Sequence, residues 1–547
     1  QKLRQRGIYY GWSHIYGHRV RPADRTRLLA YDEIANLRYP WRHLNGTTAS
    51  LVNFAPDLQD LNIELTVNML RHVNPHTGKR YADDPALAFI ELQNEDNIYW
   101  GAIQESLKQA PTYRRLLCRQ FAAWLRSRYG TDERLRAAWG SDVLPAGEGI
   151  AVENVFPNPS HGLFGHAYET AQRSGTPMPQ HLLDKMAFLY EQQDRFYQRF
   201  VRAIRATGYR GYIVGSCWQA GSGVSHYYNL LADYRAGAID RHNYFGGSGH
   251  NLDTGRVATA SMLARPGAGL LGTGLQQVAD RPFVLSEWMS MMPNEWIAES
   301  APLVAFYGMG LQGWDGSFHF ASNQPGFTAG LASRWGGVYN VDSPTQIGLY
   351  PALARIVHRG DVQEGQVVSV RRVDTTALQQ GRLGFRETVS QIGDAKDFGG
   401  DVPPHTLAVG RAVVAFENGP PVLKQENLRR YQTDTASTLP SVTGQLRWHR
   451  RGKGFVTLST PHSKAAVGFA DGHKHDLGEV SLTVNTPFAV VIVTASEPDK
   501  TLKQSKKWLV ITVARAANTG MVYSKNRQQL LRKGNPPLLL EPVDVTL

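Results

Sequence analysis

The sequence predicts an α/β protein, in which a barrel of parallel βα units is followed by an all-β sandwich. Strand-like apolar segments alternate with helical segments up to about residue 361, and several of these strands end in polar or acidic residues. From about Val362 the pattern changes to short alternating strands with turn residues between them. The first pattern is typical of parallel βα units and the second of a β-sandwich. We therefore expect a barrel domain over residues 1–361 and a sandwich domain over residues 362–547.

Length and composition agree with this division. A chain of 547 residues is too long for one ordinary core. An apolar fraction of 42% with 19% charged residues is typical of a globular protein. The longest apolar runs are far shorter than the roughly 20 residues of a membrane span. Only Cys118 and Cys217 occur, so the sequence predicts no disulfide framework and no cysteine-based zinc site. We also expect no other metal site and no cofactor.

The formal net charge of +12 comes mainly from arginines scattered along the chain. No block of Lys and Arg with interleaved aromatic residues occurs, which argues against nucleic acid as a partner. Two interpretations stay open: a solvated basic surface, or attraction of an acidic substrate. The first residues lack the apolar segment of a signal peptide, and they resemble the end of a helix that runs into a strand.

The elements of the barrel domain follow in order along the chain. A short strand begins at Gly7, and a helix with Pro56 near its start carries apolar residues at helical spacing. A second helix ends where Gly130 provides a C-terminal cap, and a third ends at Gly208. A long Pro-, Gly- and Ser-rich loop covers about residues 141–179. The later strand segments are "ALAFIEL", "GYIVGSCW", "GAIDRHNYFGG", "RPFVLSEW" and "GLQGWDGSF".

Two of these strands end in glutamates. The strand from Ala86 runs into Asn94 and Glu95, and the strand from Pro282 runs into Glu287. All strand C-termini of a parallel βα barrel face the same way, so the two carboxylates are expected to meet across one pocket. Such a pair suits cleavage of a glycosidic bond, with one carboxyl as acid and base and the other as nucleophile. The alternative for each glutamate is a solvated turn.

The motifs "LQNED" and "VLSEW" resemble those of the retaining clan A glycoside hydrolases, which are TIM (β/α)8-type barrels. The resemblance covers about residues 7–361. It implies that Glu95 is the acid/base after the fourth strand and that Glu287 is the nucleophile after the seventh. It also matches Tyr244 of "HNYFGG" to a sixth-strand aromatic residue that touches the nucleophile, and Trp314 of "QGWDG" to an eighth-strand tryptophan below the sugar.

Further side chains are assigned to the substrate. Asn94 is expected to bind the sugar 2-hydroxyl, an interaction that strengthens in the transition state. Flat faces for a pyranose ring are expected from Trp218 and Trp314, for which core packing is the alternative. Hydroxyl groups of the sugar are expected to bind His242, Gln219 and Asp315. His14 is expected to line the cleft or, alternatively, to face solvent.

The resemblance also reveals a departure. If "GIYYGW" is the third barrel strand, the chain holds six barrel strands and lacks the first two. An open barrel would expose two edges, so we expect an upstream segment of the same protein to complete it. The resulting prediction is a secreted or periplasmic retaining hydrolase of β-glycosidic bonds in an oligo- or polysaccharide, with a galactose-containing or acidic polysaccharide as a substrate.

Other functions stay open. One is a non-catalytic carbohydrate-binding protein on the same scaffold, although a binder needs neither an acid of raised pKa nor a nucleophile. Another is an inverting hydrolase or a lyase, which the stereochemistry of the product would distinguish.

Overall fold

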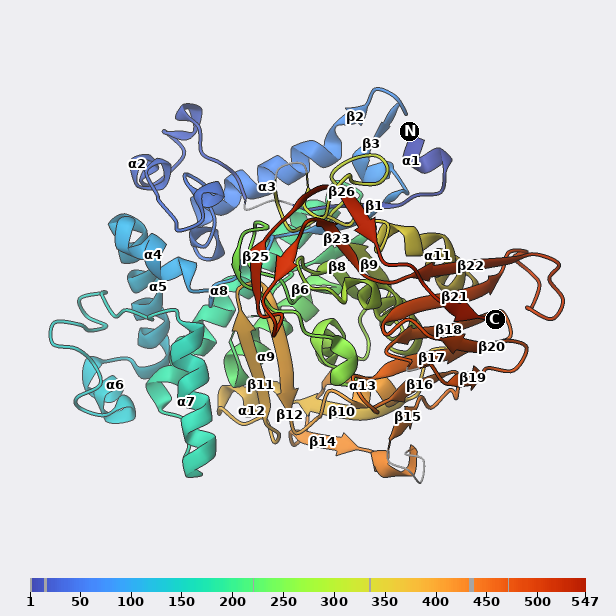
Figure 1. Cartoon of the computed structure of the whole chain (residues 1–547). Helices are drawn as coiled ribbons and strands as arrows, with labels where there is room; N and C mark the ends of the chain where they lie inside the picture. The colour runs from blue at the N-terminus through green and yellow to red at the C-terminus, as the bar shows by residue number, and fades with distance from the viewer. Residues whose placement is uncertain (1, 14–16, 220, 334–335, 432–436, 471) are drawn as a thin grey trace. The chain divides into compact units, whose positions relative to one another are not determined.

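The structure is a computed structural model that describes residues 2–13, 17–219, 221–333, 336–431, 437–470 and 472–547 (Figure 1). The chain divides into two compact units. Unit 1 comprises Gln1–Arg241, Arg372–Arg386 and Phe416–Val422, and unit 2 comprises His242–Arg371, Glu387–Ala415 and Leu423–Leu547. The border expected between residues 361 and 362 is not a border of these units, and the division into domains stays a prediction.

Unit 1 contains a short parallel sheet. Its strands, in spatial order, are β1 (Tyr10–Trp12), β4 (Leu87–Glu91) and β5 (Tyr212–Val214). Phe89 is the central residue of the register, paired with Gly11 on one side and Tyr212 on the other. Gly11 leaves room for the Phe89 ring, because a Cβ at position 11 would lie 2.3 Å from that ring.

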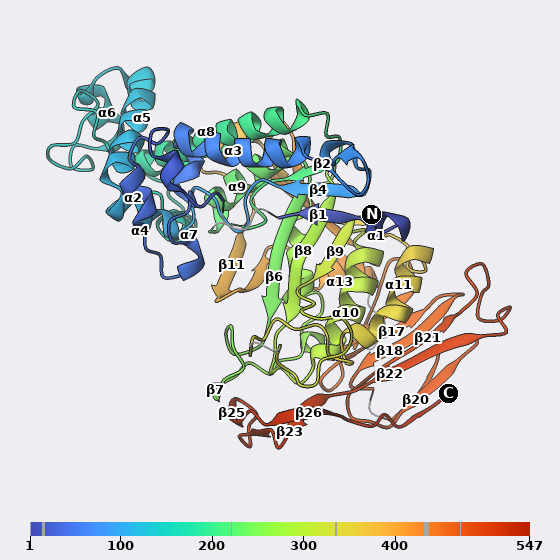
Figure 2. The same ribbon diagram turned by 90° about the horizontal axis from the view of Figure 1, so that it is seen from above.

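Helices make up most of the rest of unit 1. The longest, α8, packs against α3 and α9, and α7 also packs against α9 (Figures 1 and 2). The helices are α1 (Lys2–Gln5), α2 (Tyr31–Ala35), α3 (Pro56–Arg71), α4 (Ala102–Gln109), α5 (Pro111–Tyr129), α6 (Asp132–Trp139), α7 (His161–Ser174), α8 (Gln180–Arg205), α9 (Gly223–Ala236) and α12 (Thr375–Gln379). A small hairpin joins β2 (Val73–Asn74) to β3 (Lys79–Arg80).

The helix ends follow the sequence signals. Gly130, with φ of 80°, follows α5, and Gly208, with φ of 95°, follows α8 after a short turn. The expected apolar face of α3 is only half right: Leu58 and Leu61 are buried, but Leu65 is exposed. Its other buried side chains include polar ones, so tertiary packing decides that face.

Unit 2 contains a sheet whose strands lie in the order β11, β12, β6, β8 and β9. β8 runs parallel to β9, and β12 runs parallel to β6, where Ala395 pairs with Tyr244. Figure 2 shows β6, β8 and β9 side by side. Parallel pairing in both units agrees with the expected βα units, whereas the β11–β12 hairpin was not expected. The bounds are β6 (Ile239–Phe245), β8 (Phe283–Ser290), β9 (Gly316–His319), β11 (Glu387–Ile392) and β12 (Ala395–Gly400).

The later part of unit 2 holds two antiparallel sheets that share one apolar core. Val491 and Val493 of the larger sheet pack with Leu482 and Val484 of the smaller. The strands of the larger sheet are, in spatial order, β15 (Thr438–Pro440), β16 (Leu446–His449), β17 (Phe455–Ser459), β18 (Ser463–Gly468), β21 (Ala489–Ala495) and β22 (Trp508–Val513). The strands of the smaller sheet are, in spatial order, β19 (Lys474–Asp476), β20 (Ser481–Val484) and β27 (Val545–Thr546). This is the sandwich arrangement that the sequence predicts for this region.

The remaining elements lie wholly or mainly in unit 2. They are the helices α10 (Ser300–Leu303), α11 (Tyr350–Arg359) and α13 (Thr406–Val409), the three-stranded sheet of β13 (Arg411–Phe416), β10 (Val367–Val373) and β14 (Val422–Gln425), the pair β23 (Ala516–Thr519) and β26 (Asn535–Leu540), and the sheet of β24 (Val522–Tyr523), β25 (Gln529–Arg532) and β7 (Gly255–Arg256). Every helix in the described part of the chain is too short or too polar to span a lipid bilayer. The number of barrel strands and the upstream segment stay predictions.

Candidate active site

Glu287 of unit 2 lies on β8 among buried neighbours. Its side chain is 18% exposed, while the residues on either side of it are buried. The strand does not end there, as the sequence had indicated, but continues to Ser290. Tyr244 donates its hydroxyl to Glu287 Oε2 at 2.7 Å, and His242 Nδ1 lies 3.6 Å from the same oxygen. The other ring nitrogen of His242 is hydrogen-bonded to Ser286 Oγ at 2.8 Å.

This arrangement follows from strand geometry. His242 and Tyr244 are two residues apart on β6, so their side chains project from the same face of the sheet. A hydrogen bond to an ionised carboxylate favours the ionised form. The contact from Tyr244 thus orients the Glu287 oxygen that it binds, and orientation is one requirement of a carboxylate nucleophile.

Two aromatic residues missed in the sequence hold Tyr244 in place. The buried Tyr244 ring is packed edge to face by Tyr339, with centroids 5.2 Å apart, and by Phe320, at 6.3 Å. Phe320 directly follows β9, so the rule that polar or aromatic residues at strand ends mark the site would have found it. Tyr339 lies in a long loop and has no such signal.

Lys396 is another residue that the sequence did not indicate. Its buried ammonium donates to the carbonyl oxygen of His242 at 2.8 Å. Asn243 fixes this pairing, because its Oδ1 accepts from the Lys396 backbone at 2.9 Å while its Nδ2 donates to Thr273 Oγ1 at 2.8 Å. The β11–β12 hairpin thus brings a buried lysine side chain to the strand that carries Tyr244. Since Lys396 lies beyond the expected end of the barrel domain, only long-range pairing reveals it.

Glu95 of unit 1 lies in the turn after β4 and is partly exposed, whereas Asn94 is 4% exposed. The backbone of Glu95 has φ of 50°, in the left-handed region that a residue with a side chain rarely adopts. Such a conformation persists only where the surroundings hold it. Asn94 Oδ1 accepts a hydrogen bond from Ser13 Oγ at 3.3 Å.

A buried carboxyl braces the same turn. Asp96 accepts from the backbone N–H of Ser50 at 2.6 Å and from Gln93 Nε2 at 3.1 Å. Gln93 in turn accepts from the Tyr197 hydroxyl at 2.9 Å. Burial raises the pKa of Asp96 to about 7. The residues on both sides of Asn94 and Glu95 are therefore fixed by buried hydrogen bonds from other elements of unit 1.

Trp218 and Gln219 follow β5 in unit 1 and are both buried. The Trp218 carbonyl accepts from Ser216 Oγ and from Asn229 Nδ2, each at 2.9 Å. The Oε1 atom of Gln219 has no hydrogen-bond partner among the described residues. These positions suit residues at a strand end, and their predicted contact with a sugar stays a prediction. His14 lies outside the described residues.

Trp314 and Asp315 are not where the sequence placed them. Both precede β9, and Asp315 exchanges hydrogen bonds with Phe283, the first residue of β8. Glu287 is four positions further along β8 than Phe283. Measured along the strand, Trp314 and Asp315 therefore lie about 13 Å from Glu287, towards the opposite end of the strands. Trp314 is 2% exposed and packs on the Phe283 ring. We correct its predicted role from sugar platform to core residue, and we remove Asp315 from the candidate site.

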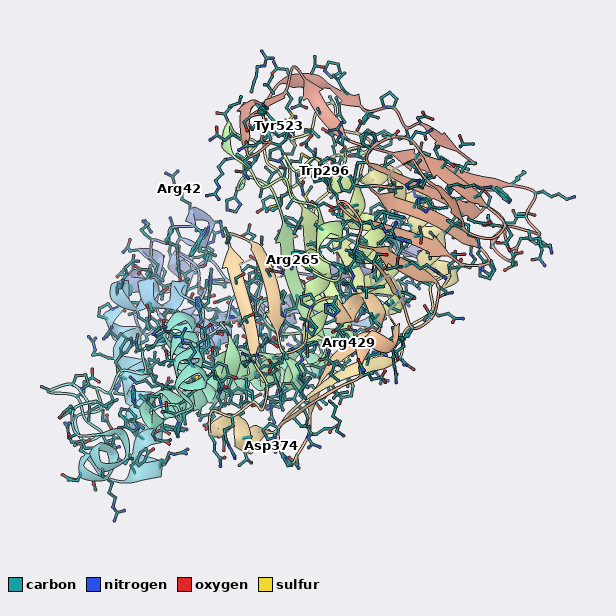
Figure 3. The ribbon with its side chains drawn as sticks, turned by 60° about the horizontal axis from the view of Figure 1, so that its bottom comes forward. Arg42, Arg265, Trp296, Asp374, Arg429 and Tyr523 are labelled. Atoms are coloured by element: carbon teal, nitrogen blue, oxygen red, sulfur yellow. The ribbon has the colours of Figure 1, made fainter. Side chains whose placement is uncertain are left out.

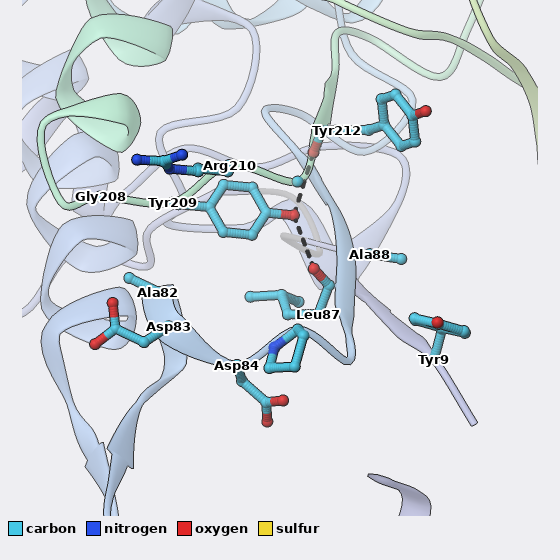
Figure 4. A pocket seen from close by; sticks show the side chains of 12 residues that line it. Tyr9, Ala82, Asp83, Asp84, Leu87, Ala88, Gly208, Tyr209, Arg210 and Tyr212 are labelled. Carbon is cyan, nitrogen blue, oxygen red and sulfur yellow. Dashed lines mark hydrogen bonds between the residues drawn. The ribbon is translucent and has the colours of Figure 1, made fainter. Parts of the chain in front are cut away.

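Unit 1 also contains a cavity of about 760 Å³ (Figure 4). It is lined by Leu87 and Ala88 at the start of β4 and by Tyr212 at the start of β5, whereas Glu95 follows the end of β4. The Tyr209 hydroxyl, hydrogen-bonded to the Leu87 carbonyl at 3.2 Å, forms part of its wall. This cavity is therefore not the predicted active site.

No protein-family model matches the sequence, and no curated protein matches it. Solved structures do show similarity. A polyextremophilic β-galactosidase from the Antarctic haloarchaeon Halorubrum lacusprofundi is 15% identical over 60% of this chain and 46% of that chain, with a TM-score of 0.35. A cold-adapted β-galactosidase from Rahnella sp. R3 is 15% identical over 69% of this chain and 50% of that one, with a TM-score of 0.40.

An exo-β-agarase is 14% identical over 49% of this chain and 33% of that chain, with a TM-score of 0.30. The chain thus spans half or less of the length of these three proteins. These three similar structures are glycoside hydrolases, at 14–15% sequence identity.

Proposed function

We propose that the protein is a retaining glycoside hydrolase that cleaves β-glycosidic bonds of an oligo- or polysaccharide. The observation that carries this proposal is the hydrogen bond from Tyr244 to Glu287, with His242 beside the same carboxylate oxygen. A partly exposed carboxylate that a buried tyrosine orients by a hydrogen bond is placed to attack an electrophilic carbon.

In the proposed reaction, a Glu287 oxygen forms a bond to the anomeric carbon while the bond to the leaving oxygen breaks. Glu95 gives its proton to that leaving oxygen. In the second step Glu95 takes a proton from water, whose oxygen attacks the anomeric carbon and releases Glu287. The proposal requires the two carboxyl groups to lie roughly 5 to 5.5 Å apart in the working enzyme, against about 6.5 to 9.5 Å for inversion.

The substrate and setting belong to the same proposal. The sugar is taken to be part of a galactose-containing or acidic polysaccharide, and the protein is taken to act outside the cytoplasm. An upstream segment of the same protein is proposed to complete the barrel. Asn94, Gln219 and Trp218 are proposed to contact the sugar, with Asn94 on the 2-hydroxyl.

The test compares two active-site variants with a surface control on a panel of aryl β-glycosides and polysaccharides. Glu287→Gln should lose several orders of magnitude in kcat. Glu95→Ala should slow the hydrolysis of substrates with poor leaving groups much more than that of substrates with activated leaving groups. Added azide should restore the rate of this variant and give a glycosyl azide of retained configuration. Glu105→Gln, on the exposed face of α4 in an ion pair with Lys108, should behave as wild type.

The stereochemistry of the first-formed product, followed by NMR, should show retention. Inversion would contradict the double-displacement mechanism. A folded Glu287→Gln variant with wild-type kcat would remove Glu287 as nucleophile. A wild-type protein that binds polysaccharide without releasing product would support the carbohydrate-binding alternative instead.

A further inference from the structure

Near the end of unit 2, residues 515–541 form two nested antiparallel strand pairs, in which β23 and β26 enclose the hairpin of β24 and β25. We call this segment the C-terminal arm. Although the arm lies in sequence between the sandwich strands β22 and β27, it is beside β7, a strand within the loop that follows β6 (Figure 2). We infer that this arm supports the proposed active site: it holds the three loops that follow β6, β8 and β9, and thereby positions Tyr244 and Glu287. The inference rests on the proposed function.

The arm joins the loop after β6 through backbone pairing. Strand β25 pairs with β7, with Gln529 opposite Arg256 and Leu530 opposite Gly255. The Val257 N–H donates to the Gln528 carbonyl at 2.9 Å, which extends the pairing. This loop follows directly from the strand that carries His242 and Tyr244.

The loop after β8 is held by charge. Glu295, at 8% exposure, receives the guanidinium groups of Arg527 and Arg515, and Arg527 Nε donates at 2.7 Å. The Tyr523 hydroxyl donates to the Pro293 carbonyl at 2.9 Å. Tyr523 and Trp296 mark this region in Figure 3. A buried carboxylate that two cations from the arm neutralise would be left unpaired without the arm, so the loop depends on it.

The loop after β9 is also attached to the arm. Asn518 Oδ1 accepts from the Leu331 backbone, and the Leu538 backbone donates to the Ala329 carbonyl, each at 2.8 Å. A Cβ at Gly330 would lie 3.2 Å from Asn518 Oδ1, so the two chains are in close contact. The same loop carries Tyr339, which packs on the Tyr244 ring.

An apolar cluster connects these contacts to Tyr244 and to β8, the strand that carries Glu287. Leu530 of the arm, at 1% exposure, belongs to one buried cluster with Tyr244, Met289 and Met291. Met521, Tyr523 and Leu538 of the arm pack against it. Long loops without secondary structure need such support, and a shift of about 1 Å in a catalytic group can cost 100-fold in rate. The arm is therefore a positioning element, with no part in the chemistry itself.

The test compares Leu530→Ala with Leu540→Ala in the full chain. Both leucines are on the arm, but Leu540 is 51% exposed and lies outside the cluster. Leu530→Ala should lower kcat at least tenfold and shift the acidic limb of the pH profile, whereas Leu540→Ala should match wild type. Hydrogen exchange of residues 246–260 and 286–296 should become faster only in Leu530→Ala, and Leu530→Met should restore both properties.

Equal kinetics and equal exchange in the two alanine variants would overturn the inference. If Leu530→Ala does not fold, the test uses Arg527→Gln, which removes the main positive partner of Glu295. This variant should show the same fall in kcat and the same faster hydrogen exchange, and Arg527→Lys should partly restore both properties. A wild-type protein without glycosidase activity would overturn the proposed function alone, because faster exchange in the variant would still support the role of the arm in holding the loops.

Discussion

At the scale of single residues, Tyr244 and Glu287 meet although 43 positions separate them in sequence. Each lies on a strand, and β6 and β8 are neighbours in one sheet. The strands themselves are visible in the sequence, because apolar residues mark them locally. The contact between the two side chains follows once the strands are adjacent, which is why a family resemblance could anticipate it.

Replacing Tyr244 by Phe should raise the pKa that governs the acidic limb of kcat/KM and lower kcat by about 10- to 100-fold. The hydroxyl favours the ionised form of Glu287, so its loss makes the carboxylate more basic and less well oriented. The measurement is the pH–rate profile with an activated aryl glycoside. An unchanged acidic limb would show that the hydrogen bond does not act on the catalytic carboxylate.

Trp314 illustrates where residue-level reasoning fails. The letters "QGWDG" match a family motif, but the position of a residue along a strand depends on where the strand begins. In the structure β9 begins at Gly316, after the motif residues Trp314 and Asp315. The prediction from the motif match was therefore wrong for Trp314, which lies at the opposite end of the strands from Glu287.

At the scale of elements, the continuous apolar run of β21 is explained by contacts on both faces of the strand. All seven of its residues are buried. One face, which includes Val491 and Val493, packs in the sandwich core, and α11 contacts the strand as well. The continuous apolar run is thus the sign of a strand covered on both faces rather than of an ordinary half-exposed sandwich strand.

Glu299 links two short helical turns of unit 2. It accepts hydrogen bonds from Ser261 Oγ and the Met262 N–H, each at 2.6 Å, and burial raises its pKa to about 8. Between pH about 4.5 and 8 the unfolded chain releases this proton while the folded chain keeps it. The free energy of unfolding should therefore fall by about 1.4 kcal/mol per pH unit across that window from this group.

Glu299→Gln mimics the protonated side chain and should flatten this dependence. We expect the Tm of the variant, measured by calorimetry, to match wild type near pH 5 and to exceed it near pH 8. The control is Glu105→Gln, whose carboxylate is exposed on α4. Parallel pH profiles for wild type and Glu299→Gln would show that the buried carboxyl does not retain its proton.

At the scale of the whole molecule, the net charge of +12 makes an ionic-strength experiment informative. If the basic surface attracts an acidic polysaccharide, KM should rise steeply with added salt, because screening limits the attraction to about 8 Å at physiological ionic strength. KM for a neutral aryl glycoside should stay constant. A polysaccharide KM that does not change with salt would assign the arginines to simple solvation.

The sequence by itself determined the alternation of strands and helices, the helix ends at Gly130 and Gly208, the position of Glu95 after a strand and that of Glu287 within one. These features depend on local periodicity and on backbone preferences of single residues. Only the tertiary structure placed Lys396 beside His242, the C-terminal arm against three distant loops, and Trp314 in the core. Those placements depend on pairing between segments that lie far apart along the chain, where the composition of either segment does not specify its partner.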